Sequence, residues 1–200
     1  MNTTSLLLVI MLVLVVSCTS TPTPIPIPPH QGCDVSITFD NEPLGSQVKV
    51  GNGSSFQTDG VPIIAKAFTW SSGTPTTGGY AEIQNTGKAG GQGQEVFINN
   101  VNLLFSFGAG RALKSLKMIY FKSGGNLNLR INDQFEYKID DFVTINASNI
   151  GGVMVNVQSL GAGKGEIDFE GPMTIIPDTD GQIEIGGQEL WFDNICGVYQ

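Results

Sequence analysis

Residues 127–139, LNLRINDQFEYKI, carry the pattern that decides the fold class. Apolar and polar side chains alternate over residues 127–131 and again over 134–139, and Asn132-Asp133 separates the two runs. Alternation with a period of two places successive side chains on opposite faces, as a half-buried strand requires. Asn and Asp are frequent in tight turns because they tolerate left-handed backbone angles. This stretch therefore predicts two strands joined by a turn.

The same alternation recurs along the chain, and no stretch shows a helical period with caps. Further alternating runs cover residues 35–39, 81–84, 153–157 and 166–169, and the C-terminal stretch 183–196 is the best-patterned part of the domain. Turn-forming pairs separate the runs, among them Asp59-Gly60, Gly124-Gly125, Asp180-Gly181 and Gly186-Gly187. Glycine accounts for 26 of 200 residues. Many short strands with glycine-rich turns predict an all-β protein, an antiparallel two-sheet β-sandwich.

The N-terminal residues indicate export. Residues 6–16, LLLVIMLVLVV, are too few to span a bilayer as a helix but fit the apolar region of an export signal. The run ends at Val15-Val16-Ser17-Cys18, which resembles the lipobox of bacterial lipoproteins. That resemblance implies that residues 1–17 are removed and that Cys18 is acylated. The protein would then be held to a membrane of the cell envelope. The alternatives are an ordinary secretory signal or an uncleaved anchor.

Residues 18–32 form the next unit, and residues 33–200 form the domain. Residues 19–31, TSTPTPIPIPPHQ, contain too many prolines for a helix or a central strand and favour an extended polyproline stalk. The only histidine, His30, lies in this stalk. The domain therefore has no histidine for a catalytic triad or for a metal site.

Cys33 and Cys196 stand at the two ends of the domain. In an oxidising compartment such a pair predicts a disulfide that joins the first and last strands. The alternative is a pair of buried free thiols.

Both ends of the domain resemble jelly-roll carbohydrate-binding modules that contain a structural calcium ion. The opening strand ends in Phe39-Asp40-Asn41-Glu42, and the closing strand reads Leu190-Trp191-Phe192-Asp193-Asn194-Ile195. The resemblance implies a jelly-roll fold with calcium held by Asp40, Glu42 and Asp193. Calcium prefers such oxygen ligands. The alternative is that these acids only end strands. No sugar-binding motif accompanies the resemblance, so the ligand does not follow from it.

A binding module for glycan or for a cell-surface partner is the favoured function. Trp70 and Tyr80 flank the polar loop 71–79, and exposed aromatic rings can stack on sugar rings. These two residues are the predicted ligand-binding side chains, and a core position is the alternative for each. A structural or adhesive surface protein without a small ligand is the second hypothesis.

Catalysis and nucleic-acid binding are less favoured. A hydrolase with two carboxylates could use the pair Asp140 and Asp141 or the pair Asp168 and Glu170. Adjacent residues of a strand face opposite ways, which disfavours the first pair, and acidic surface is common in a chain of net charge −8. The same charge and a pI near 4.4 exclude nucleic acid as the expected partner.

Overall fold

The computed structural model describes residues 32–90, 93–108 and 110–200. The export signal, Cys18 and the stalk to residue 31 lie outside the described residues. The strands are β1 (Val35–Ile37), β2 (Gly45–Gly51), β3 (Ser55–Thr58), β4 (Val61–Thr69), β5 (Pro75–Thr76), β6 (Tyr80–Gln84), β7 (Glu95–Asn99), β8 (Val101–Phe105), β9 (Leu113–Ile131), β10 (Gln134–Ile139), β11 (Ser148–Ile150), β12 (Val153–Gly161), β13 (Lys164–Met173) and β14 (Ile183–Tyr199). One 3-10 helix, η1 (Phe142–Ile145), accompanies them. Among the described residues, no helix is long and apolar enough to cross a membrane.

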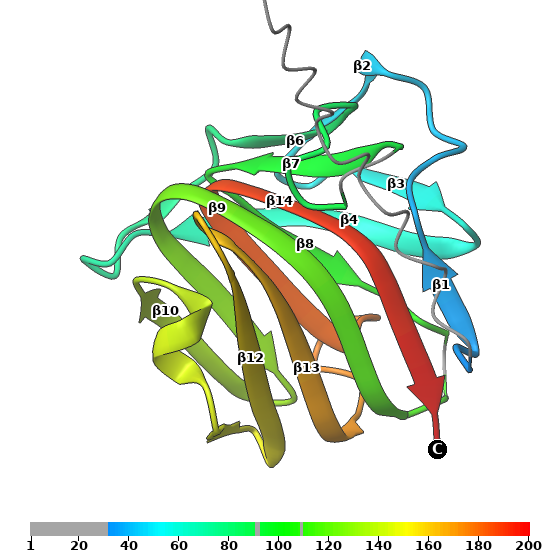
Figure 1. The fold of residues 1–200 in the computed structure, drawn as a ribbon, viewed down its shortest axis with the longest axis vertical. Coiled ribbons are helices and arrows are strands. Elements are labelled where there is room, and N and C mark those ends of the chain that lie inside the picture. The colour runs from blue at the N-terminus through cyan, green and yellow to red at the C-terminus, as the bar shows by residue number, and fades with distance from the viewer. Residues whose placement is uncertain (1–31, 91–92, 109) are drawn as a thin grey trace, which may run out of the picture.

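Two long antiparallel strands, β9 and β14, run side by side through the molecule and belong to both layers of the sandwich (Figure 1). We call the layer with the order β3-β4-β8-β14-β9-β10 layer I. Layer II has the order β2-β6-β7-β14-β9-β13-β12-β11, and β1 pairs with the C-terminal part of β14. All these pairings are antiparallel, which confirms the predicted fold class.

The glycine pairs at 124–125 and 186–187 are not the turns that their sequence predicts. Both lie inside β9 and β14, at the place where each strand passes from one layer to the other. The register of the two strands shifts there, between Gly187 and Leu190. β9 and β14 stay hydrogen-bonded to each other before and after the glycine pairs. Each strand therefore changes layer without a turn that reverses the chain.

The inner faces of the two layers form one core, as alternation predicts. Fully buried residues of layer I, such as Leu129 and Ile185, join one cluster with fully buried residues of layer II, such as Ile98 and Met118. The predicted pair of strands over 127–139 is confirmed as the C-terminal part of β9 and β10. The turn residue Asn132 has a φ of 54°.

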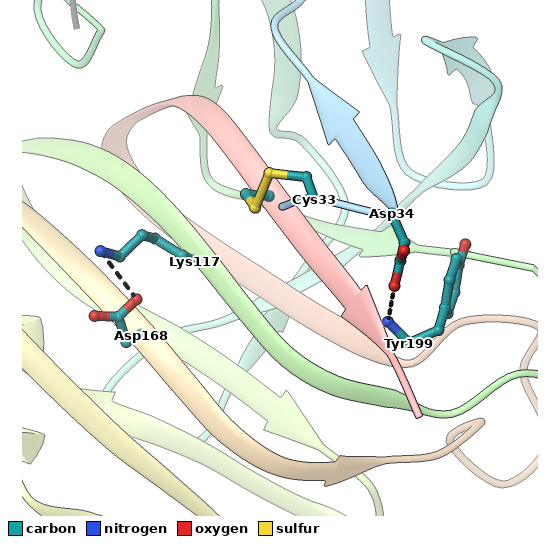
Figure 2. Close-up of a disulfide and its surroundings, with 6 residues drawn as sticks. Cys33, Asp34, Lys117, Asp168 and Tyr199 are labelled. Atoms are coloured by element: carbon teal, nitrogen blue, oxygen red, sulfur yellow. Dashed lines mark hydrogen bonds and ion pairs between the residues drawn. A yellow bond between two sulfur atoms is a disulfide. The ribbon is translucent and has the colours of Figure 1, made fainter. Parts of the chain in front are cut away.

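The disulfide between Cys33 and Cys196 is present and joins β1 to β14, as expected (Figure 2). Next to it, Asp34 accepts a hydrogen bond from the backbone N of Tyr199 at 2.8 Å. The disulfide spans 163 residues of sequence, and closing so long a loop stabilises the folded state by about 5 kcal/mol in the chain-entropy model. It also fixes the position of β1, and therefore of the acidic residues that follow β1.

Candidate functional site

The outer face of layer II carries an aromatic row beside an acidic row. Register pairs Trp191 of β14 with Phe97 of β7 and with Phe121 of β9. Two residues further along the same strands, and therefore on the same face, lie Asp193 of β14 and Glu95 of β7. The pleat of the sheet thus brings rings and carboxylates to one surface.

Four rings outside the main core form what we call the aromatic surface: Tyr80, Phe97, Phe121 and Trp191. Trp191 is central, with its ring centroid 4.4 Å from that of Phe97 and 5.6 Å from that of Phe121. Tyr80 contacts Phe97 edge to face at 6.0 Å. Trp191 and Phe97 are almost fully buried, whereas Tyr80 and Phe121 are half-buried and offer part of their rings to solvent.

Two lysines lie over these rings. The ammonium group of Lys88 lies 3.5 Å from the centroid of the Trp191 ring, and that of Lys49 lies 3.6 Å from the centroid of Tyr80. Such contacts are attractive because the faces of aromatic rings carry negative potential. Lys88 belongs to the loop that follows β6, and the described residues 85–90 of this loop cover part of the aromatic surface.

Glu95 holds this loop against the sheet. One oxygen of its carboxylate accepts hydrogen bonds from the backbone N of Lys88, at 3.0 Å, and from the hydroxyl of Thr86. The other oxygen accepts from the backbone N of Ala89 at 2.6 Å. Sequence analysis did not identify Glu95, since nothing in the sequence distinguishes it from other strand-end acids.

Asp193 is a buried carboxylate under the same loop. Its side chain accepts a hydrogen bond from the backbone N of Asn194 at 2.7 Å, and the residue is only 2% exposed. Burial, together with the nearby carboxylates of Asp40 and Glu95, raises the pKa of Asp193 to about 8. The backbone at Gly90 packs so closely on this carboxylate that a Cβ there would overlap it. An ionised Asp193 at this position requires a nearby positive charge to be stable.

Asp40 and Gln94 contribute further oxygen atoms to the acidic row that contains Asp193. Asp40 accepts a hydrogen bond from the backbone N of Gln94 at 2.7 Å. The side-chain oxygen Oε1 of Gln94 is buried and, in the part of the chain that the structure describes, has no hydrogen-bond donor. Buried oxygens without donors are uncommon, and a bound cation is one explanation for them.

These oxygens are of the kind that calcium binds. Carboxylates of Asp40 and Asp193 and the amide oxygen of Gln94 are hard ligands, to which loop carbonyls can be added. Both oxygens of Glu95 already accept hydrogen bonds from the loop. Over the described residues, no three His, Cys, Asp or Glu side chains form a metal-binding group, so the amide oxygen is needed in addition to the acids.

Glu42, Trp70 and Tyr80, the remaining predicted site residues, belong to three different segments. Glu42 is in the turn after β1, where its backbone N donates to Phe39 O at 3.1 Å, and it is not among the carboxylates that raise the pKa of Asp193. Trp70 follows β4 of layer I and contacts Phe68 edge to face at 5.4 Å. Tyr80 is in β6 of layer II. Trp70 and Tyr80 therefore do not form one shared surface.

The outer face of layer I is polar but internally bonded. Asn126 donates to Thr69 O at 3.1 Å and to Tyr137 O at 2.8 Å. Asn102 donates to Ala67 O at 3.0 Å and to the carboxylate of Glu184 at 2.6 Å. Burial raises the pKa of Glu184, although Asn102 and the charges of Arg130 and Lys66 oppose that change. These asparagines attach the end of β4 across the sheet.

The acids considered for hydrolysis have structural partners. Lys117 lies 2.7 Å from Glu166 and 3.6 Å from Asp168 (Figure 2 shows the second contact), and burial raises the pKa of Asp168. Asp141 caps η1 by accepting from the backbone N of Val143 at 3.1 Å. Glu170 and Asp140 are exposed.

Comparison with known proteins returned no matching family model, no matching curated protein and no matching solved structure.

Proposed function

We propose that this protein is an exported, lipid-anchored binding module of jelly-roll type that binds carbohydrate and contains a structural calcium ion. The observation that carries the proposal is the position of the aromatic surface one row away from the buried Asp193. The loop at residues 85–94 contacts both, through Lys88 on Trp191 and through Gly90 on Asp193.

Calcium would stabilise the conformation of this loop. Asp40, Asp193 and Gln94 would hold the ion, which adds positive charge to that of Lys164 beside the buried carboxylate of Asp193. Because Gly90 and Gln94 belong to the loop, the bound ion would stabilise its folded conformation. The loop would in turn keep Lys88 over the ring of Trp191.

Tyr80 and Phe121 are the proposed stacking residues. Both are half-buried, so each ring is fixed by the sheet and still has a solvent-accessible part. The apolar C–H face of a sugar ring packs well on such a surface. Trp191, beneath Lys88, would support them. Trp70 stays a candidate for a separate contact on layer I.

Retention of the full chain on a panel of immobilised polysaccharides tests this proposal. We expect Tyr80→Ala and Phe121→Ala to weaken binding by about 2 kcal/mol each, a typical loss for an aromatic hot spot. The melting temperature is measured on the same samples. Trp70→Ala is the matched control on the other layer.

Two outcomes would contradict the proposal. Loss of retention with Trp70→Ala alone would move the binding site to layer I. Absence of retention in the wild type over the whole panel would favour a structural or adhesive surface protein.

The anchor has its own test. Cys18→Ala should remove incorporation of labelled palmitate, because acylation requires the thiol of Cys18. Normal labelling and membrane partitioning of this variant would contradict the lipoprotein assignment.

A further inference from the structure

We infer that the ligand of the aromatic surface is an acidic sugar, one that carries a carboxylate on its ring. This inference rests on the proposed carbohydrate-binding function and specifies its substrate class. The evidence for it is the position of the lysines around the aromatic surface and the scarcity of close ion pairs between these lysines and carboxylates.

Three lysines surround the rings. Lys88 and Lys49 lie over Trp191 and Tyr80, as described above. Lys164 of β13 pairs in register with Phe121 of β9, at the other end of the aromatic row. The chain has only 10 basic residues and a net charge of −8, so three of them around one apolar surface is a local concentration of positive charge.

Their ammonium groups are available to a ligand. Within the described ranges, Lys88 and Lys164 form no ion pair, and Lys49 has only a long contact of 3.9 Å to Glu82 while its side chain is 45% exposed. Lys117, on the same face of layer II, differs clearly. It lies 2.7 Å from Glu166 in a firm ion pair, which raises its pKa. Lys88 has rings as neighbours in place of carboxylates, whereas Lys49 lies near Glu82 and the charge of Lys164 acts on Asp193.

The position of Lys88 then discriminates between ligands. Its ammonium lies on the face of Trp191, beside the half-buried ring of Phe121, whose centroid is 5.6 Å away. A sugar stacked on Phe121 would meet this charge at its edge. A neutral sugar offers only hydroxyl groups there, whereas a ring carboxylate forms a charge-assisted hydrogen bond with the ammonium.

The neighbouring carboxylates make this preference dependent on calcium. Without a cation, the carboxylates of Asp40 and Glu95 would repel an acidic ligand from the adjacent row. A bound calcium ion offsets two of these charges, so that the charges of Lys88 and Lys164 dominate locally. Acidic ligands should therefore lose more affinity than neutral ones when calcium is removed.

The test uses the full exported chain and short oligosaccharides, which do not gel with calcium. Oligogalacturonate, hyaluronan and alginate fragments are each compared by calorimetry with the same fragment after reduction of its carboxylates to alcohols. We expect at least one acidic fragment to bind and to lose at least tenfold in affinity on reduction. Lys88→Gln should remove most of that difference, and Lys88→Arg should preserve it. Lys114→Gln, an exposed lysine at the other end of β9, should change nothing.

The outcomes separate the two proposals. Equal binding of acidic and reduced fragments, or binding of neutral glycans alone, would overturn the inference and leave the proposed function intact. Absence of binding to every acidic and neutral glycan would overturn both. An acid preference that persists in Lys88→Gln would contradict the recognition role of Lys88.

Discussion

The two outer faces of the sandwich both contain buried polar groups, but a buried carboxylate beside other carboxylates is found on layer II. On layer I, Asn102 and Asn126 use their amide groups to bond backbone oxygens and Glu184. On layer II, Asp193 is buried beside other carboxylates, and the oxygen of Gln94 has no donor within the described residues. On layer I, Nε of Arg130 and Oγ1 of Thr58 still lack a partner among the described residues, whereas layer II combines an unpaired amide oxygen with a buried carboxylate among other carboxylates.

The difference shows why burial of polar groups is a weak indicator of function by itself. A fully bonded buried network rigidifies a fold, and its amides have little capacity left for a ligand. Unmet acceptors cost free energy, so their persistence indicates that something outside the chain satisfies them. On layer II the unmet acceptor accompanies a buried carboxylate, and this combination favours layer II for the binding site.

The largest expected effect is on layer I. Asn126→Ala removes the amide that donates to Thr69 O and Tyr137 O, so these two carbonyl oxygens lose a hydrogen bond. Each such group costs about 1–3 kcal/mol, so we expect the free energy of unfolding in urea to fall by about 3 kcal/mol. Asn52→Ala, at an exposed turn, should change it by less than about 0.5 kcal/mol. A small loss of unfolding free energy in Asn126→Ala, or a loss of its calcium dependence, would contradict the proposed difference between the two faces.

Asp193→Asn should act in opposite directions with and without calcium. In chelator the variant should melt higher than the wild type, because a buried carboxylate beside Asp40 and Glu95 has become neutral. With calcium at 100 times its dissociation constant, the wild type should gain about 2.7 kcal/mol, and the variant should gain much less.

Differential scanning calorimetry in chelator and in calcium measures both effects. Asp168→Asn, whose carboxylate is paired with Lys117, is the control that should keep the calcium shift. A wild-type melting curve unaffected by calcium would contradict the metal site.

The smallest effect concerns Glu184. Its folded-state pKa lies above the ordinary value of 4.5, so the folded state binds the proton more tightly than the unfolded state. Stability from this group is therefore complete below pH 4.5 and is lost as the pH rises through the folded-state pKa. Glu184→Gln should be the more stable protein at pH 7, with the difference vanishing below pH 4.5. Urea unfolding over pH 4–8 measures this, and a variant less stable at pH 7 would show that the network needs the charge.

Several features of the fold were predictable because their causes are local. The alternation at 127–139 requires only the pleat of a strand, and the turn at Asn132 requires only a residue that tolerates a positive φ. The disulfide followed from having two cysteines at the ends of one domain. Asp40 and Asp193 could be placed near each other for the same reason.

Other features depend on contacts between distant residues. Trp70 and Tyr80 flank one loop in the sequence, yet that loop connects β4 of layer I to β6 of layer II, so the two rings belong to different faces. Glu95 acquires its role only because residues 85–90 lie over the sheet, and Gln94 acquires its role because it contacts Asp40. No local pattern marks them.

The sequence by itself determined the β-class, the strand alternation and the cysteine pair, because each depends on neighbouring residues or on simple pairing. Only the tertiary structure decided that the glycine pairs in β9 and β14 carry a strand from one layer to the other. It alone placed Lys88 over Trp191 and Gly90 over Asp193. The physical reason is that alternation assigns a side chain to a face, while the elements that cover that face are set by strand register and by loops from elsewhere in the chain.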